Sequence, residues 1–117
     1  MKIKETYDLH LYLGSINEQT RKEFSHGDLI KTIGKFQDGR EMMIPVRVSV
    51  VEFVSGSQYR ERGWCISTIN YPKIDSSIED LNSFMLELAE VLISAFKQKR
   101  ICISSYNKTM MIEGDFA

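Results

Sequence analysis

The sequence predicts an α+β fold of the ferredoxin-like class, in which a split βαβ order places two helices on one face of an antiparallel sheet. Apolar residues recur every three or four positions over 76–100 and over 25–36, which indicates one long and one shorter helix. β-rich runs lie before, between and after them, giving the order β, α, β, β, α, β. A chain of 117 residues can bury one core, so 1–117 is expected to form a single domain.

The first strand and the first helix are predicted from local patterns. Leucines alternate with polar residues over 7–14, as in a strand with one buried face. The shorter helix is expected to begin at Ser25, because Asp28 follows at the spacing of a capping box. Phe24 and Leu29 have the spacing of a hydrophobic staple, which would fix the entry of the chain into this helix.

The middle of the chain is expected to form a long β-hairpin. Its strands are predicted at 42–54 and 64–71, where β-branched and aromatic residues are frequent. Residues 55–57 supply a turn, and the charged residues 58–63 are expected to extend the tip as a loop. Tyr71 precedes Pro72, which allows a cis bond, with trans as the default.

The long helix is expected to span Ser76 to Arg100 and to dominate the core. Ser76 and Glu79 form a capping-box pattern at its start, and the cations near Arg100 suit its end. The apolar arc covers roughly 220°, more than contact with one sheet requires. We therefore expect a second contact, from the shorter helix or from a second copy of the protein. The stripe predicted to face the core is Leu81, Phe84, Met85, Leu88, Leu92, Ala95 and Phe96.

The sheet face opposite the helices is expected to be open. A fourth strand is predicted at 100–106, with a short edge ribbon at 109–113. Tyrosines and arginines on such a face could stack on a base and bind a phosphate, but the face could equally mediate dimerisation or be solvated. The residues placed there by alternation are Asp8, His10, Tyr12, Arg47, Ser49, Arg100, Cys102, Ser104 and Tyr106.

Composition excludes several function classes. Fifteen Lys and Arg against sixteen Asp and Glu argue against a duplex nucleic acid partner. No run is long enough to cross a membrane and no leader pattern occurs, so a cytoplasmic protein is expected. Cys65 and Cys102 lack CxxC spacing and are expected to be buried thiols. His10 and His26 lack metal-ligand spacing, so no metal or cofactor is expected.

The hairpin tip carries the most suggestive binding residues. Tyr59, Arg60, Arg62 and Trp64 could form an anion clamp, because guanidinium groups bind phosphate through paired hydrogen bonds. Alternatively, the arginines are solvated loop charges and Trp64 belongs to the core. No catalytic motif is found, so no catalytic residue is assigned. The titratable side chains that an enzyme could use are Glu52, Glu61 and His10.

Four segments resemble small phage and bacterial ferredoxin-like proteins that include the Thoeris anti-defence sponges. These segments are LYLGSINEQT, FSHGDLIKTIGKF, YRERGW between two strands, and LAEVLISAFKQKRICI. The resemblance implies a homo-oligomer that sequesters a cyclic ADP-ribose-type signal in pockets between protomers without cleaving it. On chemical grounds, the expected ligand-binding residues are Arg47, Tyr59, Arg60, Arg62, Trp64, Arg100 and Tyr106.

We therefore predict a non-enzymatic binding protein, dimeric or larger, that sequesters a small nucleotide-type signal. One alternative is a phage inhibitory protein that captures a host protein through its open sheet face or an edge strand. Another alternative is a small enzyme with its site at the dimer seam.

Overall fold

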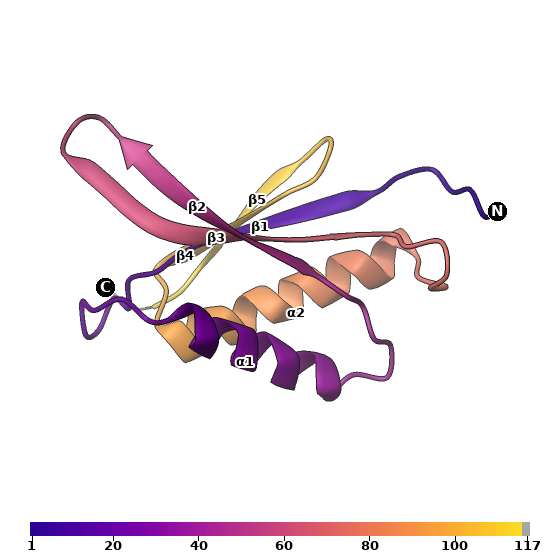
Figure 1. The fold of residues 1–117 in the computed structure, drawn as a ribbon, viewed down its shortest axis with the longest axis horizontal. Coiled ribbons are helices and arrows are strands. Elements are labelled where there is room, and N and C mark those ends of the chain that lie inside the picture. Colours follow the sequence, from indigo (N-terminus) through magenta and orange to yellow (C-terminus); the bar gives the residue numbers. More distant parts are fainter. Residues whose placement is uncertain (116–117) are drawn as a thin grey trace.

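The computed structural model describes residues 1–115 and has two layers, a five-stranded sheet and a pair of helices (Figure 1). All neighbouring strands are antiparallel, in the order β2-β3-β1-β4-β5. The predicted ferredoxin-like α+β fold is confirmed, with β5 as an extra edge strand towards the C-terminus. The elements are β1 (Asp8–Gly14), α1 (His26–Asp38), β2 (Arg47–Ser55), β3 (Tyr59–Ile69), α2 (Ile78–Phe96), β4 (Arg100–Ser104) and β5 (Thr109–Glu113).

The core lies between the sheet and the two helices, which cover the same face (Figure 1). The alternating leucines of β1 are buried there, as are most residues of the stripe predicted on α2. Ala95 of that stripe is exposed, whereas Ala89 and Ile93 are buried. Helix α1 packs beside α2 and covers one flank of the wide apolar arc, while Leu86 stays partly exposed.

The helix starts are set by serine caps. Ser25 caps α1, as predicted, through a hydrogen bond from the third residue after it. The predicted cap of α2 is wrong by one residue. Ser77, not Ser76, accepts from the amide of Asp80 at 3.0 Å, and the Asp80 carboxylate accepts from the Ser77 amide at 2.8 Å. Ser76 with Glu79 and Ser77 with Asp80 both have the spacing of a capping box, so the sequence alone does not distinguish them.

The helix ends also differ from the prediction. Helix α2 stops at Phe96 rather than at Arg100, because Lys97 adopts a left-handed conformation with φ 52° and ψ 52°. The cations that follow therefore do not lie in its last turn. Helix α1 continues two residues past Phe36, to Asp38.

The hairpin of β2 and β3 differs from the prediction at its tip. Residues 56–58 form the turn, with Gly56 at φ 74°, and residues 59–63, expected as a loop, continue β3 opposite 51–55. β1 pairs with β3 only as far as Gly63, so the hairpin extends beyond β1 and protrudes from the body (Figure 1). No cis peptide bond occurs in residues 1–115, so Tyr71–Pro72 is trans.

The sheet face away from the helices carries the polar residues that strand alternation predicted, except Tyr106, which follows the end of β4 and lines a cleft with Ile78 and Asn82 of α2. Tyr12 of β1 pairs with Cys65 on one side and with Cys102 on the other, and both cysteines are free thiols. No helix of residues 1–115 has the length and apolar character needed to cross a membrane.

Candidate functional site

The seven side chains predicted to bind a ligand do not converge on one place. They are spread over three clefts and two other surface positions. Tyr59 and Arg100 line one cleft, Arg62 and Trp64 a second, and Tyr106 a third, while Arg47 lies opposite Ser67 and Arg60 is exposed on the protruding hairpin.

Strand alternation explains why the predicted anion clamp is divided. Tyr59 and Glu61 hydrogen-bond to each other on one face of β3. Arg60, Arg62 and Trp64 alternate with them and so belong to the opposite face, where Trp64 enters the core. The four clamp side chains therefore do not lie together.

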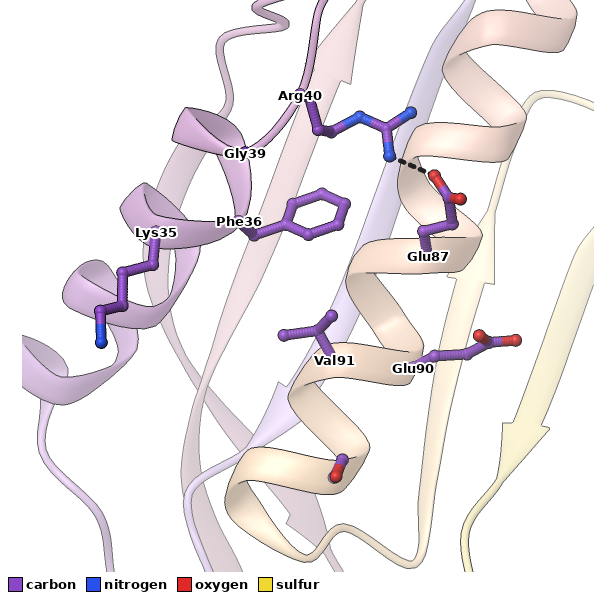
Figure 2. Close-up of a pocket in the computed structure, with 8 residues that line it drawn as sticks. Lys35, Phe36, Gly39, Arg40, Glu87, Glu90 and Val91 are labelled. Carbon is purple, nitrogen blue, oxygen red and sulfur yellow. Dashed lines mark hydrogen bonds and ion pairs between the residues drawn. The ribbon is translucent and has the colours of Figure 1, made fainter.

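A groove with a volume of about 610 Å³ runs between the two helices (Figure 2). Its main charges neutralise each other, because the Arg40 guanidinium is ion-paired with Glu87 across the groove. The Arg40 guanidinium carbon also lies 5.2 Å from the centre of the Phe36 ring and 5.4 Å from that of Phe84. These contacts tie α1 to α2, so we interpret the groove as structural.

A smaller cleft, at the base of the hairpin, contains a fixed carboxylate and is the candidate site. Gly14 of β1 lines it and pairs with Gly63 of β3. A Cβ at Gly14 would lie 2.0 Å from Glu61 Oε2, and one at Gly63 would lie 2.5 Å from a carbon of the Phe53 ring. The carboxylate and the ring therefore rest where a larger residue would stand.

Two hydrogen bonds hold the Glu61 carboxylate in this cleft. The hydroxyl of Tyr59 donates to Oε1, and the backbone amide of Ile16 donates to Oε2 at 3.4 Å. Oε1 thus accepts from a donor on β3 itself, and Oε2 accepts from a donor on the loop after β1. The half-buried carboxylate is oriented before any ligand arrives.

The Glu61 carboxylate in turn changes the titration of Tyr59. The hydrogen bond to Glu61 raises the pKa of the Tyr59 phenol above its usual 10.0, with smaller contributions from desolvation and from the charge of Glu61. Tyr59 is therefore neutral at physiological pH and remains a hydrogen-bond donor to the carboxylate.

The loop after β1 is fixed to the end of α2, and this holds the Ile16 amide next to the Glu61 carboxylate. The backbone amide of Glu18 donates to the carbonyl of Lys97 at 3.1 Å. The buried side-chain amide of Gln98 donates to the carbonyl of Ile16 at 2.9 Å. This loop therefore has little freedom to move away from Glu61.

The cleft combines both signs of charge with aromatic rings. The Glu61 carboxylate lies on it with the rings of Phe53 and Tyr59, and together they suit a cationic group, which carboxylates and ring faces both attract. Glu18 also lines the cleft, but its carboxylate is ion-paired with Arg21. The positive residues of the cleft are Lys99 and Arg100, which suit a carboxylate. The arrangement can orient a small zwitterion that also carries an additional positive charge.

Sequence reasoning found this cleft only in part. Tyr59 and Arg100 were predicted to bind a ligand, and Glu61 was recognised only as one of three titratable side chains. Gly14 and Phe53 were not singled out, because their role depends on β1 and β2 meeting β3 at this register. The strand-like alternation in YRERGW was the available signal for placing Glu61 beside Tyr59.

Comparison with known proteins shows a likeness in structure. No protein-family model and no curated protein matches the sequence. A solved structure of a phage SAM lyase in the apo state has a TM-score of 0.78 and 14% identity, covering 95% of this chain and 91% of that chain. A phage SAM lyase in complex with S-methyl-5'-thioadenosine has a TM-score of 0.73 and 12% identity, covering 100% and 96%. At these identities the likeness establishes the shared fold.

These neighbours overturn the function predicted from the sequence. We predicted a non-enzymatic protein that sequesters a nucleotide-type signal, whereas both neighbours are an enzyme. The prediction of a protein without enzymatic activity is corrected accordingly, and the alternative of a small enzyme has the better support. One neighbour holds a nucleoside, which is compatible with the small nucleotide-like ligand expected here. The hydrophobic spacing behind our prediction is shared by many ferredoxin-like proteins and could not separate binders from enzymes.

Proposed function

We propose that this protein is a lyase that cleaves S-adenosylmethionine at the Glu61 cleft. The observation that carries the proposal is the Glu61 carboxylate, held by two hydrogen bonds beside the rings of Phe53 and Tyr59. Its support from outside the chain is the fold shared with the two phage SAM lyase structures.

The bond to be broken follows from the ligand held by one neighbour. S-methyl-5'-thioadenosine retains the sulfur, its methyl group and the adenosine of S-adenosylmethionine. If it is the product here, the broken bond joins the sulfonium sulfur to the γ-carbon of the amino-acid chain. The bonding electron pair stays on sulfur and turns the sulfonium cation into a neutral thioether.

A lyase breaks this bond without water, so the γ-carbon must acquire a new bond from within the substrate. The substrate's own carboxylate can attack the γ-carbon, which forms a five-membered lactone and releases the thioether. Atoms and charges balance without a co-reactant. Loss of a proton from the β-carbon would also balance, but it requires a base. The internal attack needs no base, so we favour it and assign Glu61, whose carboxylate is oriented by two hydrogen bonds, to holding the substrate.

The charges of the cleft match those of this substrate. The ammonium and sulfonium groups are attracted by the Glu61 carboxylate, and the rings of Phe53 and Tyr59 offer faces to a cation. Lys99 and Arg100 can orient the substrate carboxylate. The reaction joins an anion to a cation and cancels both charges, so a site that excludes water accelerates it.

A homo-oligomer is part of the proposal, because the cleft is open in one chain. The Tyr59 ring that lines the cleft is 47% exposed, and on the opposite face of the hairpin Val50 is 64% and Val54 is 61% exposed. A second copy seated on the protruding hairpin would cover these side chains and exclude water from the cleft.

The test is chemical. The purified protein is incubated with S-adenosylmethionine, and both products are identified by chromatography and NMR. We expect S-methyl-5'-thioadenosine and the lactone. Glu61→Gln should lower the rate by about 100-fold, as loss of one oriented electrostatic contact does in other enzymes. Glu52→Gln is the matched control, since Glu52 is exposed on the other face of the hairpin and should leave the rate unchanged. An active Glu61→Gln variant would refute the assignment of the site.

A further inference from the structure

A second cleft, of about 410 Å³, lies on the helix side of the sheet, and the proposed lyase chemistry does not use it. It is formed where the end of β1, the start of α1 and the hairpin meet. The Glu61 carboxylate lies on the opposite face of β3. The residues that matter below are Ser15, Glu23, Phe24, His26, Arg62 and Trp64.

Ser15 places an unsatisfied hydroxyl group at this cleft. Its side chain is 1% exposed, and its Oγ has no hydrogen-bond partner among the described residues. The Ser15 backbone is fully engaged, because its amide donates to the carbonyl of Arg62 and its carbonyl accepts from Phe24. A buried hydroxyl without a partner is unfavourable by about 1–3 kcal/mol, so a ligand that supplies the missing bond would be stabilised there.

The start of α1 adds hydrogen-bond donors. The hydroxyl of Ser25 accepts from Asp28, and its carbonyl accepts from Leu29. The amides of His26 and Gly27 donate to no acceptor within residues 1–115. They lie at the positive end of the dipole of this 13-residue helix. This end of α1 is therefore suited to an anion.

A hydrogen bond from Trp64 fixes the tautomer of His26. The indole Nε1 donates to His26 Nδ1 at 2.9 Å, so the neutral imidazole carries its proton on Nε2. His26 thus offers a second donor in addition to its backbone amide.

Two opposite charges complete the cleft. Arg62 is exposed and stands opposite Glu52 in the strand register, but no ion pair joins Arg62 to any residue of the described chain. Glu23 lines the same cleft and would repel a ligand that carries only negative charge. The apolar surface between them comes from Phe24 and Trp64, whose ring centres are 5.2 Å apart.

We propose that this cleft binds a free α-amino acid with an apolar side chain. The amino-acid carboxylate is held by Arg62 and the donors of His26, and Ser15 supplies a further hydrogen bond. The ammonium group is held by Glu23, and the side chain lies against Phe24 and Trp64. This site is independent of the proposed lyase activity.

Trp64 is the only tryptophan of the chain and reports on this cleft. The experiment titrates the intact protein with L-methionine and follows the intrinsic fluorescence of Trp64. We expect a saturable change that weakens at least tenfold in Arg62→Gln and roughly three- to tenfold in Ser15→Ala, as expected for loss of a charged and of a neutral hydrogen bond. Arg62 is exposed, so its substitution should leave the fold intact.

Three controls make the result decisive. 3-(Methylthio)propylamine, which lacks the carboxylate, should not bind, and inorganic phosphate should bind more weakly than L-methionine. Glu61→Gln should leave the titration unchanged, which separates this cleft from the proposed lyase site. The proposal is overturned if L-methionine gives no saturable change, if Arg62→Gln binds normally, or if phosphate binds and L-methionine does not.

Discussion

Replacing Gly14 with alanine should damage the candidate site while leaving the fold intact. The added Cβ would lie 2.0 Å from Glu61 Oε2, whereas ordinary contact begins at 3.4 Å, so the carboxylate must move by about 1.4 Å. That movement takes Glu61 away from the Ile16 amide, which donates to the same oxygen. A misplacement of the substrate by about 1 Å can lower a rate by about 100-fold.

The stability of the Gly14→Ala variant should change little. The atom that the Cβ meets is the end of a flexible side chain, and Gly14 is not among the residues with positive φ. Alanine at a compatible backbone position stabilises a protein by about 0.4–1 kcal/mol through the unfolded state, which offsets the local strain. We expect the free energy of unfolding to stay within about 1 kcal/mol of the wild type.

The assay compares two measurements on the same preparations, kcat/KM for release of S-methyl-5'-thioadenosine and the urea unfolding midpoint. We expect kcat/KM to fall by about 100-fold and the midpoint to stay nearly unchanged. A variant that folds normally and retains full activity would show that the chemistry does not depend on where Glu61 lies, and it would refute the reasoning.

Three further perturbations test other parts of the structure. Gly63→Ala should be destabilising by about 1–3 kcal/mol in urea unfolding, because its Cβ would lie 2.3 Å from the fixed backbone carbonyl of Leu13; unchanged unfolding would contradict this register. Leu88→Asp should prevent folding, since it buries an unpaired carboxylate in a fully buried position, and a cooperatively melting variant would argue against the placement of α2. The pKa of Tyr59 should lie above 10.0 in an ultraviolet titration, with Tyr59→Phe identifying its signal, and should fall in Glu61→Gln. Because that pKa is raised in the folded state, the Tyr59 contribution to stability is complete below pH 10.0 and is lost as the pH rises through the folded pKa.

The fold could be predicted because its signals are local and periodic. The alternation in β1 and the three-to-four spacing in α2 each report which face is buried, and Ser25 marks a helix start. The start of α2 was uncertain by one residue because Ser76 and Ser77 are each followed, three positions on, by an acid. Its end was missed because a left-handed Lys97 has no signature in the sequence.

The candidate site was harder to predict because it depends on contacts between distant segments. The alternating YRERGW segment was interpreted as a charged loop, although it pairs residue by residue with β2. Glu61 gains its importance only when Gly14 lies opposite Gly63 and the Ile16 amide meets the carboxylate. The register that places Gly14 opposite Gly63 cannot be deduced from the sequence before the strand pairing is known.

The most direct test of the account is the number of S-methyl-5'-thioadenosine molecules that one chain releases from excess S-adenosylmethionine. A catalyst releases many per chain, and we predict this for the wild-type protein, with a rate about 100-fold lower in Glu61→Gln. A protein that only binds its ligand releases none. Recovery of S-adenosylmethionine unchanged, with the protein folded, would contradict the lyase proposal.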